Sequence, residues 1–146
     1  MKTQRRSKGA SDMEMARVLL VDDDVASRLT LQTVLQAGGY RVDSAASAAE
    51  AYGKLDEQEY ELVLSDLQME SPEAGLRVIQ HARNMDYKPA TAIVTTYQNA
   101  RPTDRKVKVL ISPEDVPTLL SQVANLISLR ATKRIERELL TAAAHH

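Results

Sequence analysis

Cysteine, phenylalanine and tryptophan are absent from the 146 residues of this chain, and tyrosine, present five times, is its only aromatic residue. Without cysteine there is no disulfide framework, no thiolate nucleophile and no cysteine-ligated metal. Without Phe and Trp, a core must be built from Leu, Val, Ile and Ala, with a little Met. The hydrophobic content of 43% is sufficient for one globular domain that buries its own core.

Long apolar runs and a strong excess of one charge are also missing. No stretch approaches the roughly 20 apolar residues of a membrane-spanning helix, and no signal-peptide core is visible. We therefore expect a cytoplasmic protein without a membrane partner. The net charge of −1 gives no general attraction to nucleic acid. The glycine-rich loops G-x-G-x-x-G and G-K-[ST] are absent, which argues against a nucleotide enzyme.

The most informative segment is the apolar run at residues 18–21, which ends in Asp22, Asp23 and Asp24. Adjacent carboxylates at the end of a buried strand raise each other's pKa unless a cation occupies the site. Mg²⁺ suits such a site, because it takes one or two carboxylates together with waters and a phosphate. The alternative is a solvated turn in which Asp24 caps the next helix. The triplet alone favours neither interpretation.

Two later apolar runs also end in polar side chains. Residues 62–65 are followed by Asp66, and residues 92–94 by Thr95 and Thr96. In an open parallel sheet the C-terminal ends of the strands line one crevice, so we expect these side chains to converge with the acids of the first strand.

The segments between these runs alternate between strand and helix patterns. A helix after the first strand ends at Gly38-Gly39, a strand follows at about 40–44, and Ser47 and Glu50 have the spacing of a capping box. The later elements are a third helix from Gly75, a fourth strand through Ile93, a fifth strand from Val107 to Ile111, and a last helix capped by Ser112 or Asp115. Because the strands are continuously apolar, both faces of the sheet should be covered by helices.

From residue 17 to about residue 129 the chain resembles the receiver domain of two-component response regulators. The resemblance rests on V-D-D at 21–23, S-D-L-Q-M at 65–69, Gly75-Leu76, T-T-Y at 95–97 and S-P-E-D at 112–115. It implies an α/β, doubly wound, flavodoxin-like fold. The expected five-stranded parallel sheet has the order 2-1-3-4-5, with helices on both faces.

The resemblance also implies roles for particular residues. Asp66 would accept a phosphoryl group from a sensor histidine kinase or a phosphotransfer protein, with no separate enzyme activity. Asp23, Asp66 and the backbone carbonyl of Gln68 would ligate Mg²⁺, and Asp22 would act mainly through water. Thr95 would hydrogen-bond the phosphoryl group and act as a switch toward a downstream protein.

Two departures from the family pattern concern the fifth strand. Aligning on S-P-E-D places Val109 where receivers carry a lysine, and Lys108 would substitute only if the strand slipped by one residue. The segment between Thr95 and Val109 is too short for a full crossover helix, and it contains a central proline. We therefore expect the fourth helix to be missing or degenerate, the fifth strand to be displaced or antiparallel, and the output surface to lie elsewhere.

A further departure is the loop after Asp66. It carries one extra residue and the acids Glu70 and Glu73, which could weaken docking of an anionic phosphodonor.

The chain divides into three predicted parts. Residues 1–15 are a disordered tail or a leader rather than a nucleic-acid arm, residues 16–129 are the receiver domain, and residues 130–146 are a helical extension and tail. In the extension, Ile135 and Leu139 would be covered by a partner helix or a homodimer mate, or would belong to a frayed end. Arg130, Arg134 and Arg137 share one face, which we expect to be solvated. The sequence contains no helix-turn-helix segment, so direct binding to nucleic acid is not predicted.

Two functions remain open at this point. The first is a phosphorylatable receiver without an effector domain, favoured because Asp22, Asp23, Asp66 and Thr95 are all present. The second is a receiver-like interaction module that has lost phosphorylation control. His81 has no evident Ser or Asp partner, so a catalytic triad is not predicted.

Overall fold

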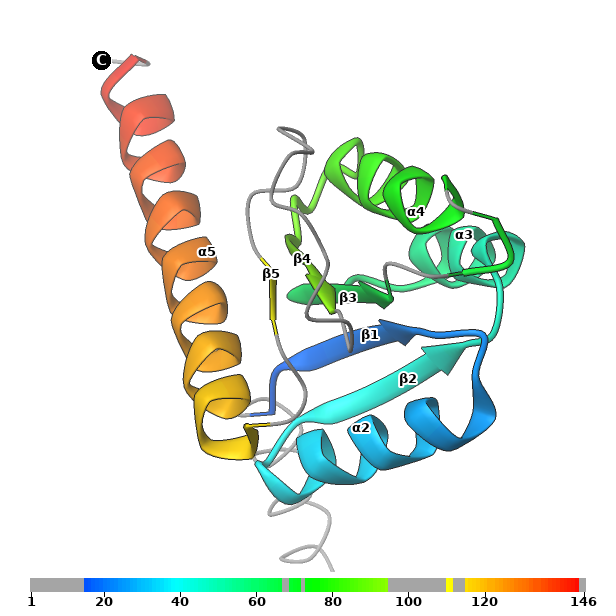
Figure 1. The fold of residues 1–146 in the computed structure, drawn as a ribbon. Coiled ribbons are helices and arrows are strands. Elements are labelled where there is room, and N and C mark those ends of the chain that lie inside the picture. The colour runs from blue at the N-terminus through cyan, green and yellow to red at the C-terminus, as the bar shows by residue number, and fades with distance from the viewer. Residues whose placement is uncertain (1–14, 67–68, 72, 95–109, 112–114, 145–146) are drawn as a thin grey trace, which may run out of the picture.

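A parallel sheet forms the centre of the molecule (Figure 1). The computed structural model describes residues 15–66, 69–71, 73–94, 110–111 and 115–144. The strands lie in the order β2-β1-β3-β4-β5, and every neighbouring pair is parallel. Their bounds are β1 (Arg17–Val21), β2 (Arg41–Ala45), β3 (Leu62–Asp66), β4 (Ala90–Val94) and β5 (Leu110–Ile111). The predicted strand order and doubly wound class are confirmed.

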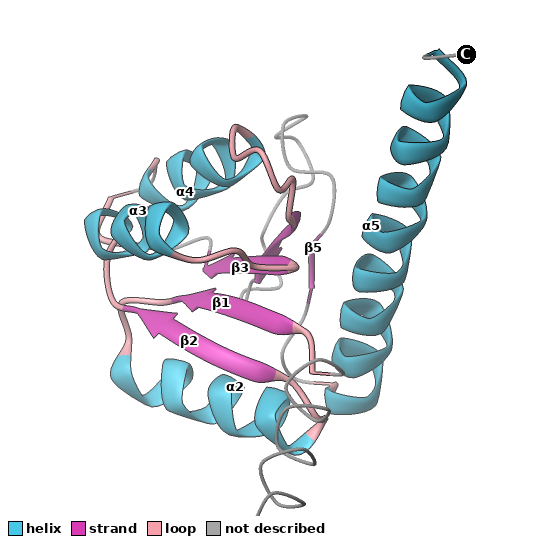
Figure 2. Cartoon of the chain, turned by 180° about the vertical axis from the view of Figure 1, so that it is seen from behind, coloured by secondary structure: helices cyan, strands magenta, loops and turns pink. Residues whose placement is uncertain are grey.

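Helices cover both faces of this sheet, as the two opposite views in Figures 1 and 2 show. The helices are α2 (Val25–Ala37), α3 (Ala48–Glu57), α4 (Ala74–Arg83) and α5 (Val116–Ala144). Two separate apolar clusters define the layers. One joins α3 and α4 to the sheet, and the other joins α2 and α5 to its opposite face.

Side chains of the central strands alternate between these two clusters. In β1, Leu19 and Val21 belong to the α3–α4 cluster, whereas Val18 and Leu20 belong to the α2–α5 cluster. All four are fully buried. The continuous apolar runs of the sequence therefore reflect a sheet that is covered on both sides.

The helix starts follow the predicted capping residues. The Asp24 side chain accepts a hydrogen bond from the Ser27 amide at 2.9 Å, and the Ser47 hydroxyl accepts one from the Glu50 amide at 3.1 Å. The Glu50 carboxylate accepts from the Ala46 amide at 3.1 Å. At the end of α2, Gly39 adopts φ 97°, a left-handed conformation that glycine adopts without a steric penalty.

Three expectations about the C-terminal third have different outcomes. The antiparallel alternative for the fifth strand is wrong, because Leu110 and Ile111 pair in parallel with Ile93 and Val94. The last helix continues past Leu139 as predicted, and it runs unbroken to Ala144. The reduced fourth helix at 98–104 lies outside the described residues and stays a prediction. At the other end of the chain, residues 1–14 of the leader predicted at 1–15 also lie outside the described residues.

No helix in the described ranges has the combination of length and apolar character that crossing a membrane requires.

Candidate functional site

Three carboxylates meet at the C-terminal edge of the sheet. Asp22 and Asp23 follow β1, and Asp66 is the last residue of the neighbouring strand β3. One oxygen from each of the three side chains lies within 4.8 Å of the other two. The predicted convergence of the two strand ends is therefore present in the structure.

Three hydrogen bonds fix the position of Asp22. Its amide donates to the Ala45 carbonyl at 3.0 Å, and its carbonyl accepts from Arg28 Nη1 at 2.7 Å. Its Oδ1 accepts from the Asp24 amide at 2.9 Å, and the residue is only 2% exposed. Arg28 was not predicted as part of this site, because a contact from an arginine side chain to the carbonyl six residues earlier leaves no recognisable pattern in the sequence.

The electrostatics of the cluster favour binding of a cation. The pKa of Asp22 is raised to about 7, chiefly by burial. The hydrogen bond from the Asp24 amide opposes this change, whereas the negative charge of Asp66 and a hydrogen bond to its side chain contribute to it. A divalent cation would compensate these repelling charges, and carboxylate oxygens are the donors that Mg²⁺ prefers. The residues present therefore fit a Mg²⁺ site.

Glycine is required where α4 begins next to Asp66. A Cβ atom at Gly75 would lie 2.5 Å from the Asp66 carbonyl oxygen and 3.4 Å from Ser65 Oγ. Real Cβ atoms do not approach a backbone oxygen so closely, so any larger residue would push α4 away from the end of β3. The Gly75-Leu76 motif thus keeps α4 close to the backbone of Asp66.

The extra acid in the loop after Asp66 has a structural contact. Glu70 Oε1 accepts a hydrogen bond from the Ala48 amide at 2.9 Å, which satisfies one of the free donors at the start of α3. The neighbouring Met69 is buried. Glu70 therefore fastens this loop to α3, in addition to any effect on docking of a phosphodonor.

The structure also corrects the expectation for His81. Its Nε2 lies 2.9 Å from Asp56 Oδ1, and its ring stacks on Tyr52 with the ring centroids 4.7 Å apart. The pair joins α3 to α4. The expectation that His81 lacks an Asp partner was wrong. The partner was not evident in the sequence, because Asp56 is 25 residues away.

The remaining predicted site residues are Gln68, Thr95 and Lys108, together with the departure at Val109. All four lie outside the described residues, so their roles stay predictions.

The family model of the response regulator receiver domain matches residues 18–111, which is more than half of the chain. The chain therefore belongs to the response regulator receiver family. The fold and the positions of Asp22, Asp23 and Asp66 agree with this assignment.

The curated relatives differ in how much of their own length the match covers. A probable chemotaxis protein CheY from Rhizobium etli is 37% identical over 60% of this chain and 69% of its own length. The response regulator receiver protein CpdR from Brucella abortus is 26% identical over 77% of this chain and 98% of its own length. The transcriptional regulatory protein ZraR of Klebsiella oxytoca is 30% identical over 59% of this chain, but the match spans only 19% of ZraR.

Solved structures of receiver proteins share the fold. The response regulator TrrA from Thermotoga maritima, solved in complex with Mg²⁺ and BeF, is 28% identical with a TM-score of 0.68. The match covers 77% of this chain and 99% of TrrA. The chemotaxis response regulator CheY4 of Vibrio cholerae is 26% identical with a TM-score of 0.67, over 77% of this chain and 98% of CheY4.

Proposed function

We propose that the protein is a phosphoacceptor receiver in which Asp66 takes a phosphoryl group from a sensor histidine kinase or a phosphotransfer protein. The observation that carries the proposal is the meeting of Asp22, Asp23 and Asp66 within 4.8 Å in a chain of the receiver family. Phosphorylation would then change the binding of a downstream protein.

The chemistry needs a nucleophile and a way to reduce charge repulsion. A carboxylate oxygen of Asp66 attacks phosphorus, the bond between phosphorus and the donor breaks, and the product is an acyl phosphate. Mg²⁺, when bound, neutralises charge between the anionic donor and the anionic nucleophile. Asp22, Asp23, Asp66 and the backbone carbonyl of Gln68 would hold it. Thr95 would donate a hydrogen bond to a phosphoryl oxygen.

We infer no separate enzyme activity, because these residues supply only the protein's own phosphorylation and dephosphorylation. TrrA, whose structure contains Mg²⁺ and BeF, supports the cofactor assignment by likeness.

One sequence observation favours a second candidate, a pseudo-receiver that binds its partner without phosphorylation. Val109 occupies the aligned position of the lysine that pairs with the phosphoryl group in receivers. A valine cannot supply that positive charge. Lys108 could do so only after a shift of the strand register.

The test is the intact mass of the protein after incubation with acetyl phosphate. We expect one added phosphoryl group that requires Mg²⁺ and disappears in Asp66→Asn. Asp43→Asn is the matched control, because Asp43 lies on β2 outside the carboxylate cluster, and it should be phosphorylated like the wild type.

A short-lived acyl phosphate could escape detection by mass. The protein should therefore also be melted with beryllofluoride and Mg²⁺, and we expect stabilisation that Asp66→Asn abolishes. No mass change together with no thermal shift would reject the phosphoacceptor and favour the pseudo-receiver.

A further inference from the structure

A pocket of about 440 Å³ at the N-terminal end of β4 concentrates positive charge. It lies between the end of α4, the start of β4 and the middle of α5, at the opposite edge of the sheet from the carboxylates. Its cationic lining residues are Arg83, Lys88, Arg130, Lys133 and Arg137. None of the described residues that line it is acidic, so the pocket is strongly positive although the chain has a net charge of −1.

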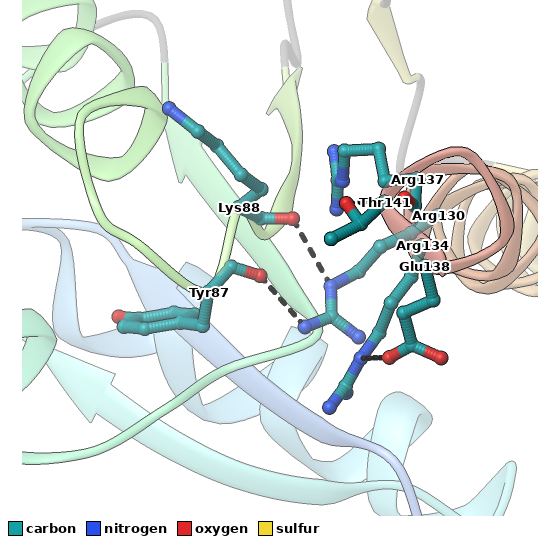
Figure 3. A network of polar contacts seen from close by, with 7 residues as sticks. All are labelled: Tyr87, Lys88, Arg130, Arg134, Arg137, Glu138 and Thr141. Atoms are coloured by element: carbon teal, nitrogen blue, oxygen red, sulfur yellow. Dashed lines mark hydrogen bonds and ion pairs between the residues drawn. The ribbon is translucent and has the colours of Figure 1, made fainter. Parts of the chain in front are cut away.

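Most of these cations are available to an incoming anion. Within the described part of the chain, Arg83, Lys133 and Arg137 make no ion pair with a carboxylate. Two cations are already engaged with backbone carbonyls. The Arg130 guanidinium donates to the carbonyls of Tyr87 and Lys88 (Figure 3), and the Lys88 ammonium donates to the Arg83 carbonyl at 3.0 Å.

The cations also repel one another. Burial lowers the pKa of Arg130, the negative charge of Glu61 opposes this change, and the charges of Arg134 and Arg137 lower the pKa further. A bound anion would relieve this repulsion. Guanidinium groups form paired hydrogen bonds with phosphate oxygens, so a phosphate is the anion that these arginines suit best.

The same pocket has an apolar part. Pro89, Leu126 and Leu129 line it beside the cations, and Leu129 is 51% exposed without a covering group in the described structure. The volume falls within the roughly 300 to 1,000 Å³ typical of small-molecule sites. A ligand that matches this lining carries phosphates on one side and a flat apolar ring on the other. We propose that the pocket binds a nucleotide, held by side-chain cations rather than by a glycine-rich loop.

The surroundings favour a small nucleotide over a nucleic acid. A second groove of about 860 Å³ shares Arg137 with this pocket. Its lining holds more acids than bases, because Asp56, Glu57, Glu59, Asp86 and Glu138 outnumber Arg134 and Arg137. A polyanion extending from the basic pocket across this groove would meet those carboxylates, which repel phosphates. The positive region is therefore limited to the size of one ligand. Binding there needs neither Asp66 nor Mg²⁺, so it is independent of the proposed phosphorylation.

The experiment is a calorimetric titration of the full chain with ATP and with GTP, without Mg²⁺ and without a phosphodonor. Inorganic phosphate and adenosine are titrated as the two halves of the ligand. We expect one of the nucleotides to bind more tightly than either half. Amide NMR shifts should move at Lys88, Ala90, Thr91 and Leu126–Arg130, and not at Asp22–Asp24.

Variants separate this site from general electrostatic attraction. The double variant Arg83→Gln/Lys133→Gln should weaken nucleotide binding at least about tenfold, since it removes two charge-assisted contacts. Arg134→Gln is the matched control, because Arg134 lies on the same helix but lines only the acidic groove. Its effect should stay within about twofold, as expected for an exposed charge outside the site.

Three results would overturn the proposal. The first is no binding of either nucleotide at millimolar concentration. The second is equal binding of inorganic phosphate, which would mean an unspecific anion site. The third is tighter binding of single-stranded oligonucleotides than of nucleotides, which would indicate a nucleic-acid surface. Thermal melts of both variants check that any loss of binding does not come from unfolding.

Discussion

At the scale of single residues, the buried carboxyl of Asp22 couples stability to pH. Its pKa is about 7 in the folded protein against an ordinary value of 3.8. Between these values the unfolded chain releases the proton and the folded protein keeps it, so the free energy of unfolding falls as pH rises. Each pKa unit corresponds to about 1.4 kcal/mol, so the loss is on the order of a few kcal/mol. Urea unfolding at pH 5 and pH 7.5 without Mg²⁺ measures it.

Two variants test the assignment of this effect. Asp22→Asn should remove most of the decline between pH 5 and pH 7.5, whereas Asp24→Asn should retain it. The pKa of Asp24 is lowered by its hydrogen bonds with Ser27, so its stabilising effect is lost only at lower pH. Mg²⁺ at pH 7.5 should restore stability to the wild type. An equal decline in Asp22→Asn would show that another group causes it.

A second prediction at this scale concerns the contact between Gly75 and Asp66. Gly75→Ala places a Cβ 2.5 Å from the Asp66 carbonyl oxygen, so α4 must shift. We expect a loss of about 1 to 3 kcal/mol in the free energy of unfolding, as for other overpacked sites. Calorimetric titration should also show weaker Mg²⁺ binding, because the Asp66 backbone moves with the helix.

Gly53→Ala is the matched control for that substitution. Gly53 lies inside α3, and a Cβ there meets nothing within 4 Å. This variant should gain about 0.5 to 1 kcal/mol from the higher helix propensity of alanine. Mg²⁺ affinity should not change. If both variants behaved alike, the close approach at Gly75 would have no energetic importance.

At the scale of elements, Arg130 fastens the long helix α5 to the loop before β4. Its Nη2 donates to the Tyr87 carbonyl at 2.8 Å, and its Nε donates to the Lys88 carbonyl at 3.1 Å. Lys88 adopts φ 45°, a left-handed conformation that is unfavourable for a residue with a side chain. The two hydrogen bonds therefore help to hold this loop in its conformation. The sequence predicted that all three arginines are solvated; Arg134 and Arg137 are exposed, but Arg130 is half-buried.

Arg130→Gln should release this loop. We expect faster amide hydrogen exchange at residues 86–88 and a stability loss of about 1 to 2 kcal/mol, because charged donors are lost. Arg134→Gln serves as the comparison. It breaks only an exposed ion pair with Glu138, worth less than about 1 kcal/mol. Equal exchange rates in the two variants would contradict the role of Arg130.

The elements themselves were largely predictable from the sequence. Continuous apolar runs mark the ends of β1, just before Asp22, and of β3, at Asp66. Ser47 marks the start of α3, so local patterns were enough to locate these element boundaries. The contacts of Arg28, Glu70 and Arg130 were not predictable. Each joins a side chain to a backbone group of another segment, and such a contact follows from the packed fold rather than from any periodicity.

At the scale of the whole molecule, the C-terminal half of α5 presents apolar side chains to solvent. Ile135 and Leu139 are four residues apart on one helical face, and they are 56% and 65% exposed. Burying the exposed part of these side chains from two copies would gain about 4 to 7 kcal/mol. Losses of similar size oppose any association, so we expect only a weak homodimer that forms at high protein concentration. Sedimentation velocity over a range of protein concentrations measures this association.

Lysine substitutions on different faces of α5 test whether the face of Ile135 and Leu139 forms the contact. Ile135→Lys/Leu139→Lys should remain monomeric at concentrations where the wild type associates, because each dimer would bury four ammonium groups. Leu140→Lys is the control, since Leu140 is 71% exposed but turned about 100° away from Leu139 on the helix. It should associate like the wild type. If the wild type itself stayed monomeric throughout, the homodimer would be rejected, which would leave a different partner helix or an uncovered helix end.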